Sequence, residues 1–192
     1  GQVLSQAGDS VYMIALMWLM LDLTGSAALT GLAAMSAYLP TLLFGLMAGV
    51  VADRFNRRTV MALSDLARAA LVVSIPVLAW SGKIHGGQGA LILGVVTFLV
   101  ACVSTLFNPA RDSLIPDLVP SDRLTLANGL IQTSWQLAMF VGPLLAGLLI
   151  PLMGLMWLFT FDSATFALSM MFILLLPHAA GRVQGASSRR FS

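Results

Sequence analysis

The chain has 192 residues, of which 58% are hydrophobic and only 9% are charged, and its mean hydropathy is +0.92. Water-soluble domains do not have this composition, whereas apolar stretches of about 20 residues are typical of membrane helices. The net charge of +2 comes from basic residues clustered between apolar stretches, so it indicates membrane topology rather than nucleic-acid binding. The single cysteine, Cys102, lies inside an apolar stretch and cannot form an internal disulfide.

Six apolar stretches are long enough to cross a bilayer. They predict an all-α membrane bundle over residues 1–177, with helices at residues 1–23, 28–52, 59–80, 90–107, 124–150 and 155–176. A polar, proline-rich inner loop is expected at residues 108–123, and the basic tail at residues 178–192 is interpreted as a cytoplasmic linker. Because the chain begins with Gly inside an apolar stretch, without the basic region of a signal peptide, we expect its natural start upstream.

The first predicted helix has one polar face. Gln2, Gln6, Asp9 and Met13 recur on this face at helical spacing, and we predict that they line a cavity. Acidic residues within membrane helices are costly, so they are candidates for function. Asp9 is one such candidate, and Asp162 in the sixth predicted helix is another.

The second predicted helix leads into a short, strongly charged segment. Thr41, Gly45 and Gly49 form a row of small residues that should let a neighbouring helix approach closely, and Pro40 should kink the helix. The segment at residues 53–58 then carries four charges in six residues. Each charge would cost at least ~2.5–3.5 kcal/mol at the bilayer centre, so this segment is predicted to be a loop outside the hydrocarbon core.

The third predicted helix contains an acid and a base three residues apart. Asp65 and Arg68 can pair on one face of the helix. Arg68 lies ~15 Å beyond Arg58 at 1.5 Å per residue, which places the pair near the middle of the membrane. We interpret this intramembrane pair as structural, with a functional role as the alternative.

The fifth predicted helix carries two rows of residues at helical spacing. The polar row is Asn128, Gln132 and Gln136, and the small row is Ala138, Gly142 and Ala146. At 100° per residue the two rows lie on different sides of the helix. We therefore expect the polar row to face a cavity and the small row to pack on a neighbouring helix.

The positions of the basic residues predict the topology. One orientation gathers most of them on the cytoplasmic side, as the positive-inside rule requires, and leaves only Lys83 outside. It predicts a multi-pass protein of the bacterial inner membrane with both ends in the cytoplasm. The residues placed inside are Arg54, Arg57, Arg58, Arg111, Arg123 and the three arginines of the tail.

The sequence motifs of common enzyme classes are absent. Gly82-Lys83 lacks the upstream glycine of a phosphate-binding loop, and no His-Glu-x-x-His sequence occurs. His85 and His178 lie at predicted helix ends, away from any nucleophile. We predict that the chain is not an enzyme and that it has no cofactor, no metal site and no nucleic-acid partner.

The segment from Gly49 to Arg58 resembles the signature of the major facilitator superfamily, Gly-x-x-x-Asp-Arg-x-Gly-Arg-Arg/Lys, found between its second and third membrane helices. Asn56 stands where the family usually has Gly, and Asn also tolerates a left-handed backbone. The resemblance implies that this loop takes part in conformational switching. It also implies the N-terminal six-helix half of a 12-helix transporter, built from two three-helix repeats of inverted topology. The matching residues are Gly49, Asp53, Arg54, Arg57 and Arg58.

The segment Gly142-Pro143-Leu-Leu-Ala146-Gly147 resembles the antiporter motif of the same superfamily, Gly-x-x-x-Gly-Pro-x-x-Gly-Gly. Ala138 replaces the first glycine of the motif, and Ala146 replaces the penultimate one. Asn108-Pro-Ala-Arg111 and the following Leu-Ile-Pro-Asp-Leu-Val-Pro resemble the exporter branch that includes enterobactin, macrolide and multidrug efflux proteins.

These resemblances imply secondary active export of an amphipathic small molecule, such as a drug or a siderophore, in exchange for protons. The partners would be the lipid bilayer, the substrate, protons and a second six-helix half. Asp9 is our first candidate for the proton-coupling acid and Asp162 is the second, while a permanent Asp9–Arg68 ion pair is the structural alternative. A six-helix scaffold without transport activity and an importer of the same fold are the alternative functions.

Overall fold

The computed structural model describes residues 2–175, and their side chains except those of residues 2–4, 53, 117 and 118. The predicted tail at 178–192 lies outside the described residues. Helices account for nearly all of the described chain, no strand occurs in it, and six segments are long and apolar enough to cross a membrane. The elements are α1 (Gln2–Thr24), α2 (Ala27–Ser36), α3 (Leu39–Arg54), α4 (Arg57–Trp80), α5 (Gly86–Leu118), the 3-10 turn η1 (Ser121–Arg123), α6 (Leu124–Met153) and α7 (Leu155–Leu174).

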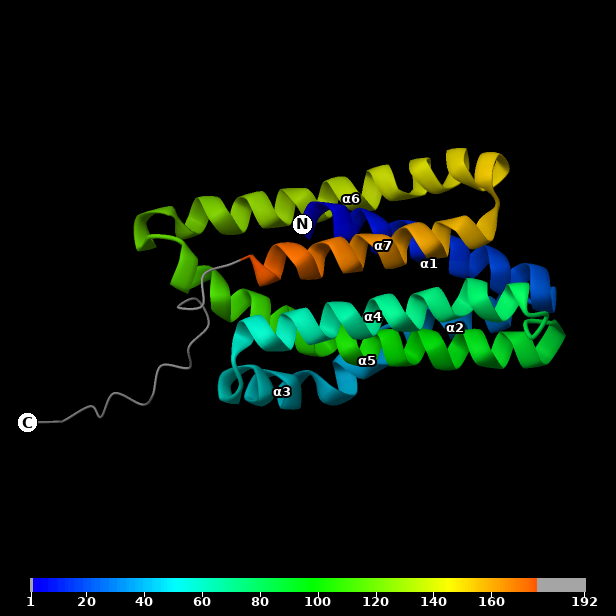
Figure 1. Ribbon diagram of the computed structural model, residues 1–192, viewed down its shortest axis with the longest axis horizontal. Coiled ribbons are helices and arrows are strands. Elements are labelled where there is room, and N and C mark those ends of the chain that lie inside the picture. The colour runs from blue at the N-terminus through cyan, green and yellow to red at the C-terminus, as the bar shows by residue number, and fades with distance from the viewer. Residues whose placement is uncertain (1, 176–192) are drawn as a thin grey trace, which may run out of the picture.

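The helices run back and forth along the bundle (Figure 1). Because α2 and α3 together make one span, α1 to α4 form a first set of three spans, and α5 to α7 form a second. Three is an odd number, so the second set enters the bundle from the opposite end and has the inverted direction. The connections α3–α4 and α5–α6 lie at the end that we call the arginine end, because it carries Arg54, Arg57, Arg58, Arg111 and Arg123.

The predicted second helix is interrupted rather than kinked. Backbone hydrogen bonds tighten to i→i+3 spacing at its break, where Ala37 donates to Ala34 and Tyr38 donates to Met35. Pro40 follows in the first turn of α3, lacks an N–H group and disfavours helical backbone in the residue before it. The chain therefore ends one helix and begins another within the same span.

The predicted inner loop at residues 108–123 is wrong over most of its length. Helix α5 continues to Leu118, with Pro109 and Pro116 inside it. Its continuation is stabilised by packing, since Phe107, Ala110 and Leu114 recur at helical spacing and are buried in one cluster at the arginine end. Only a short connection, which includes η1, separates α5 from α6.

The residues of α3 that pack on a neighbouring helix are not the predicted row of small residues. A Cβ added at Gly45 or Gly49 would contact nothing within 4 Å. The contact with α5 instead involves the neighbouring face, where Ala48 and Ala52 are buried and the Thr41 hydroxyl lies 3.2 Å from that of Thr105. Alanine is small enough for close helix packing, so the approach does not require glycine here.

The main core lies between α1, α4, α5 and α7. Helix α4 buries one continuous stripe and packs mainly on α7 and α5, while α1 packs on α6 and α7. Phe159 and Phe166 of α7 and Leu16 of α1 are fully buried at the centre. Gly154, with a φ of +83°, makes the sharp corner between α6 and α7 that brings α7 back into this core.

Candidate transport cavity

A cavity of about 440 Å³ opens between the two sets of spans. Its walls come from α1, the break between α2 and α3, and helices α4 to α7. The residues that line it lie in the middle of the bundle and toward the arginine end. Its polar and charged residues are Ser5, Gln6, Asp9, Ser10, Thr41, Arg68, Thr97, Ser104, Asn108, Arg111 and Ser169, and its large apolar and aromatic residues include Tyr12, Met13, Tyr38, Phe107, Trp135 and Met139.

The polar face of α1 faces this cavity. Gln6, Asp9 and Met13 all line it, and the side chain of Asp9 is exposed. The side chain of Gln2, which the sequence places on the same face, lies outside the described residues. The Gln6 Oε1 atom is buried and has no hydrogen-bond partner among the described residues. Helix α1 therefore presents an acid and an amide to the cavity one turn apart.

The two rows of α6 occupy different environments. Ala138, Gly142 and Ala146 are buried against α1, and a Cβ on Gly142 would overlap the Cβ of Ser10. Pro143 lines the cavity, and Gly147 is exposed. The polar residues Asn128, Gln132 and Gln136 are exposed but do not line this cavity. The cavity is lined instead by Trp135, Met139 and Pro143, which form the adjacent row at the same spacing.

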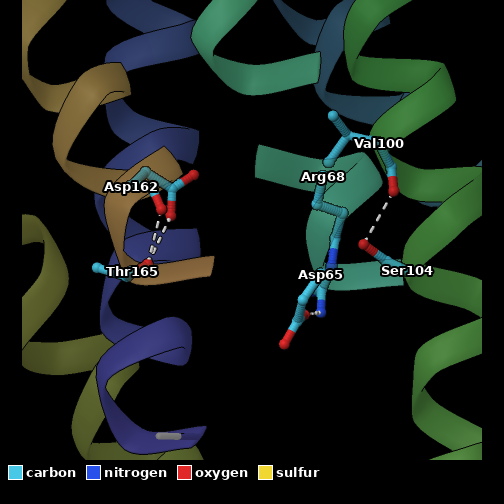
Figure 2. A network of polar contacts seen from close by, with 6 residues as sticks. All are labelled: Asp65, Arg68, Val100, Ser104, Asp162 and Thr165. Carbon is cyan, nitrogen blue, oxygen red and sulfur yellow. Dashed lines mark hydrogen bonds and ion pairs between the residues drawn. The ribbon is translucent and has the colours of Figure 1, made fainter. Parts of the chain in front are cut away.

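Arg68 is the cation at the centre of the bundle. It is 4% exposed and forms an ion pair with Asp65, which is fully buried (Figure 2). Its guanidinium carbon lies 4.4 Å from the ring centre of Phe107 and 4.3 Å from that of Phe166. A planar guanidinium stacks favourably on aromatic faces, so the two rings and Asp65 together stabilise a charge at this depth.

Asp162 lies on the face of α7 that packs against α1. Its side chain is 1% exposed, and its Oδ1 atom lies 3.4 Å from the Thr165 hydroxyl oxygen (Figure 2). Gly8 covers it, because a Cβ on Gly8 would overlap Asp162 and lie 2.6 Å from Thr165 Oγ1. Asp9, the next residue of α1, faces the cavity instead. Of the two acids expected from the sequence, Asp9 therefore lines the cavity, whereas Asp162 is buried between α7 and α1.

A hydrogen bond links α1 to α5 at the cavity wall. The hydroxyl oxygens of Tyr12 and Thr97 are 2.9 Å apart, and both side chains are buried. The Tyr12 ring also packs edge-on against Phe159, with ring centres 5.6 Å apart. On α5 the Ser104 hydroxyl donates to the Val100 carbonyl oxygen (Figure 2), so it is satisfied within its own helix.

The charged loop at the arginine end ties three helices together. Arg57 donates to the Ser113 carbonyl oxygen of α5 at 2.8 Å. Arg58 donates to the carbonyl oxygens of Ile173 and Leu174 at the end of α7, the first at 3.0 Å. Arg54 is exposed, and the side chain of Asp53 lies outside the described residues. The loop that matches the sequence signature is thus bound to both α5 and α7.

Asn56 in this loop has an extended backbone rather than the left-handed one suggested by comparison with Gly. Its φ is −61° and its ψ is 115°. The side-chain oxygen accepts a hydrogen bond from the Thr59 N–H at 3.3 Å, so Asn56 is the N-cap of α4. Asparagine is among the preferred N-cap residues, and this role accounts for its presence here.

Sequence reasoning missed several residues of the site. Trp135 and Met139 repeat at helical spacing, but the neighbouring polar row gave the stronger signal. Phe107 and Phe166 could not be found, because nothing in the sequence connects them with Arg68. Gly8 was also missed, since a single glycine does not reveal which helix it contacts.

Comparison with known proteins identifies the class to which this fold and cavity belong. The family model of the Major Facilitator Superfamily matches residues 1–191. The chain therefore belongs to the major facilitator superfamily, a family of membrane transporters rather than enzymes. The match agrees with the six spans, the inverted sets of three helices and the signature in the charged loop. No solved structure gives a significant match to the chain.

Among characterised relatives, the chain is similar to efflux proteins. It is 32% identical to the multidrug efflux pump Tap of Mycobacterium tuberculosis, over 97% of the chain and 46% of that protein. It is 27% identical to macrolide efflux protein A of Streptococcus pyogenes, over 96% of the chain and 45% of that protein. The chain thus spans about half the length of the curated relatives that it matches.

Proposed function

We propose that the chain forms half of a proton-coupled exporter of amphipathic small molecules. The observation that carries the proposal is the cavity itself, in which the exposed carboxyl group of Asp9 faces a wall of aromatic and methionine side chains. Few polar groups in a mostly apolar cavity are typical of small-molecule sites, and methionine adapts to ligands of different shape. The similarity to efflux proteins supports export rather than import.

The chemistry of the cavity favours a drug-like cation over an anionic siderophore. Arg68 is neutralised by Asp65, and Arg111 forms an ion pair with Asp112 at 2.8 Å. Asp9 has no ion pair among the described residues, so the remaining charge of the cavity wall is negative when this acid is ionised. An anionic chelator would be repelled by it, whereas an amine with apolar rings would be attracted.

A second six-helix unit is needed to enclose the transport path. The polar row of Asn128, Gln132 and Gln136 is exposed, as is Asp9, and polar groups are not stable against lipid. A pseudosymmetric partner half would cover these faces and complete the site near the midplane of the membrane. We place the arginine end, and with it both chain ends, in the cytoplasm because of the basic residues there.

The coupling acid in this proposal is Asp9, which the substrate and the proton would occupy in turn. An acid that alternates between a wet cavity and a closed one can bind and release a proton. The structural alternative requires Asp9 to pair with Arg68, but the ion pair of Arg68 is formed with Asp65. This arrangement leaves Asp9 available to the cavity.

The test uses inverted membrane vesicles that contain the full-length protein, with an imposed pH difference and a fluorescent amphipathic cation as the substrate. Asp9→Asn should still bind the dye but should lose most of the proton-driven transport. Asp22→Asn, near the other end of α1 where the side chain is exposed, is the matched control and should transport normally. Wild-type transport by Asp9→Asn would exclude Asp9 from the coupling step.

A further inference from the structure

We propose that Asp162 is a second proton-binding site, a neutral carboxyl group in the state described here, which Gly8 of α1 separates from the cavity. The proposal rests on the proposed proton-coupled transport. It extends that function, because it gives the protein a second protonation site in addition to Asp9. Four features of the site carry it: the burial of the carboxyl group, its hydrogen bonds, the charges around it and the glycine that covers it.

Burial and missing partners make a charged Asp162 unfavourable. The side chain is 1% exposed, and its Oδ2 atom is buried without a hydrogen-bond partner among the described residues. A buried carboxylate is tolerated when several donors or a cation satisfy both of its oxygens. Here no ion pair to Asp162 is formed within the described part of the chain, so the neutral form fits the site better.

The hydrogen bonds of Thr165 point to the same protonation state. The Thr165 hydroxyl donates to the backbone carbonyl oxygen of Asp162 at 2.8 Å, and its other close contact is to Asp162 Oδ1 at 3.4 Å. A hydroxyl group has a single hydrogen, and the shorter contact holds it. A charged carboxylate at Asp162 would therefore receive only a long, weak hydrogen bond from Thr165, which does little to stabilise the charge.

The surrounding charges do not supply a free cation. Helices α1, α4 and α6 pack against α7, and the ionisable groups that act on Asp162 are Asp9 and Tyr12 of α1 and Arg68 of α4. Asp65 engages Arg68 directly, and α6 contains no ionisable residue. Three acids therefore share one arginine, and an ionised Asp162 would be repelled by an ionised Asp9.

The position of Gly8 connects Asp162 to the cavity. A Cβ at this position would overlap the Asp162 carboxyl group and approach Thr165, so the backbone of α1 lies directly on the acid. Asp9, the next residue, is exposed to the cavity. A small displacement of α1 from α7 would remove this cover and place both carboxyl groups in one space, where the proton can pass between them.

The direct test is infrared spectroscopy of the purified full-length protein at neutral pH, which detects the carbonyl stretch of a protonated carboxyl group. The wild-type protein should show this band. Asp162→Asn should abolish it, while Asp9→Asn and the control Asp22→Asn should retain it. A wild-type protein without the band would overturn the proposal, as would a band lost in Asp9→Asn but kept in Asp162→Asn.

Two further variants keep the proposal falsifiable if Asp162→Asn does not fold. Thr165→Val removes the hydroxyl and should shift the band to higher frequency, because the frequency reports the hydrogen bond of the carboxyl group. Gly8→Ala should displace α1 and weaken the band as water reaches the acid. Gly129→Ala is the control for it, since a Cβ there contacts nothing within 4 Å, and it should leave the band unchanged. A band unaffected by both Thr165→Val and Gly8→Ala would show that Asp162 is not its source.

The infrared measurement requires no transport, so its outcome is independent of the vesicle assay. If the vesicles show no proton-driven export while the Asp162 band is present, proton coupling fails and the buried neutral acid stands. If export is proton-driven and the band is absent, Asp9 works without a second site and the proposal for Asp162 fails.

Discussion

Gly142 of α6 lies against Ser10 of α1 so closely that a Cβ on the glycine would overlap the Cβ of the serine and lie 3.3 Å from its Cα. This contact determines how closely α6 can approach α1. It thereby determines the positions of Pro143 and Met139 in the cavity wall. Gly142 is one of the residues that the sequence singles out through its likeness to the antiporter motif, and here its small size has a specific packing consequence.

We predict that Gly142→Leu separates α1 from α6. Overpacking a close contact typically costs ~1–3 kcal/mol, and a leucine side chain is at the upper end of that range. The melting temperature of the purified full-length protein should fall, and export of the amphipathic dye should fall with it. Leu144→Ala, at a side chain that is 67% exposed, is the control and should change neither. Equal tolerance at both positions would contradict the packing described here.

We predict that Arg58 stabilises the end of α7 through its bonds to the Ile173 and Leu174 carbonyl oxygens. The last carbonyl groups of a helix have no partner within the helix, and a bond from a charged donor is worth ~1.5–3 kcal/mol. Arg58→Gln should therefore lower the melting temperature. Arg123→Gln, at an arginine whose side chain is 73% exposed, should leave it nearly unchanged. Similar stabilities of the two variants would exclude this role.

We predict that the two rings around Arg68 require a guanidinium. Lysine keeps the charge but lacks the planar group that stacks between Phe107 and Phe166. Arg68→Lys should destabilise the protein by ~1–2 kcal/mol, measured by chemical or thermal unfolding in detergent. The same change in the double variant with Phe107→Leu should cost less, because one of the two ring contacts is already gone. Additive effects of the two substitutions would show that stacking on Phe107 contributes nothing.

We predict that Asp53→Asn impairs export without lowering the abundance of the protein in the membrane. This prediction rests on the resemblance of the loop to the family signature, which implies that the charge acts during conformational switching. The control is Asp122→Asn, at a side chain that is 75% exposed at the same end of the bundle. Quantitative blotting and dye efflux from intact cells measure the two quantities separately. Normal efflux by Asp53→Asn would remove the charge from the switching step.

The sequence by itself determined the class of the protein and its spans. Stretches of apolar residues specify membrane helices because the bilayer core excludes unsatisfied backbone and charge, and this constraint acts locally. For the same reason, the charged loop before α4 could be located from its residues alone, and Pro40 marked the position, though not the form, of the irregularity in the second span. The Asp65–Arg68 pair was also predictable, since two residues three positions apart on a helix must meet.

Only the tertiary structure decided which faces meet and what lies between them. The extension of α5 past Asn108 depends on burial of Ala110 and Leu114 against three other helices, which overrides a polar, proline-rich sequence. Helix rotation and crossing decide that Trp135 rather than Gln136 lines the cavity. They also bring the aromatic rings to Arg68 and place Gly8 directly against Asp162. Rotation is set by the fit of side chains from helices far apart in the chain, and a single sequence read along its length does not contain that fit.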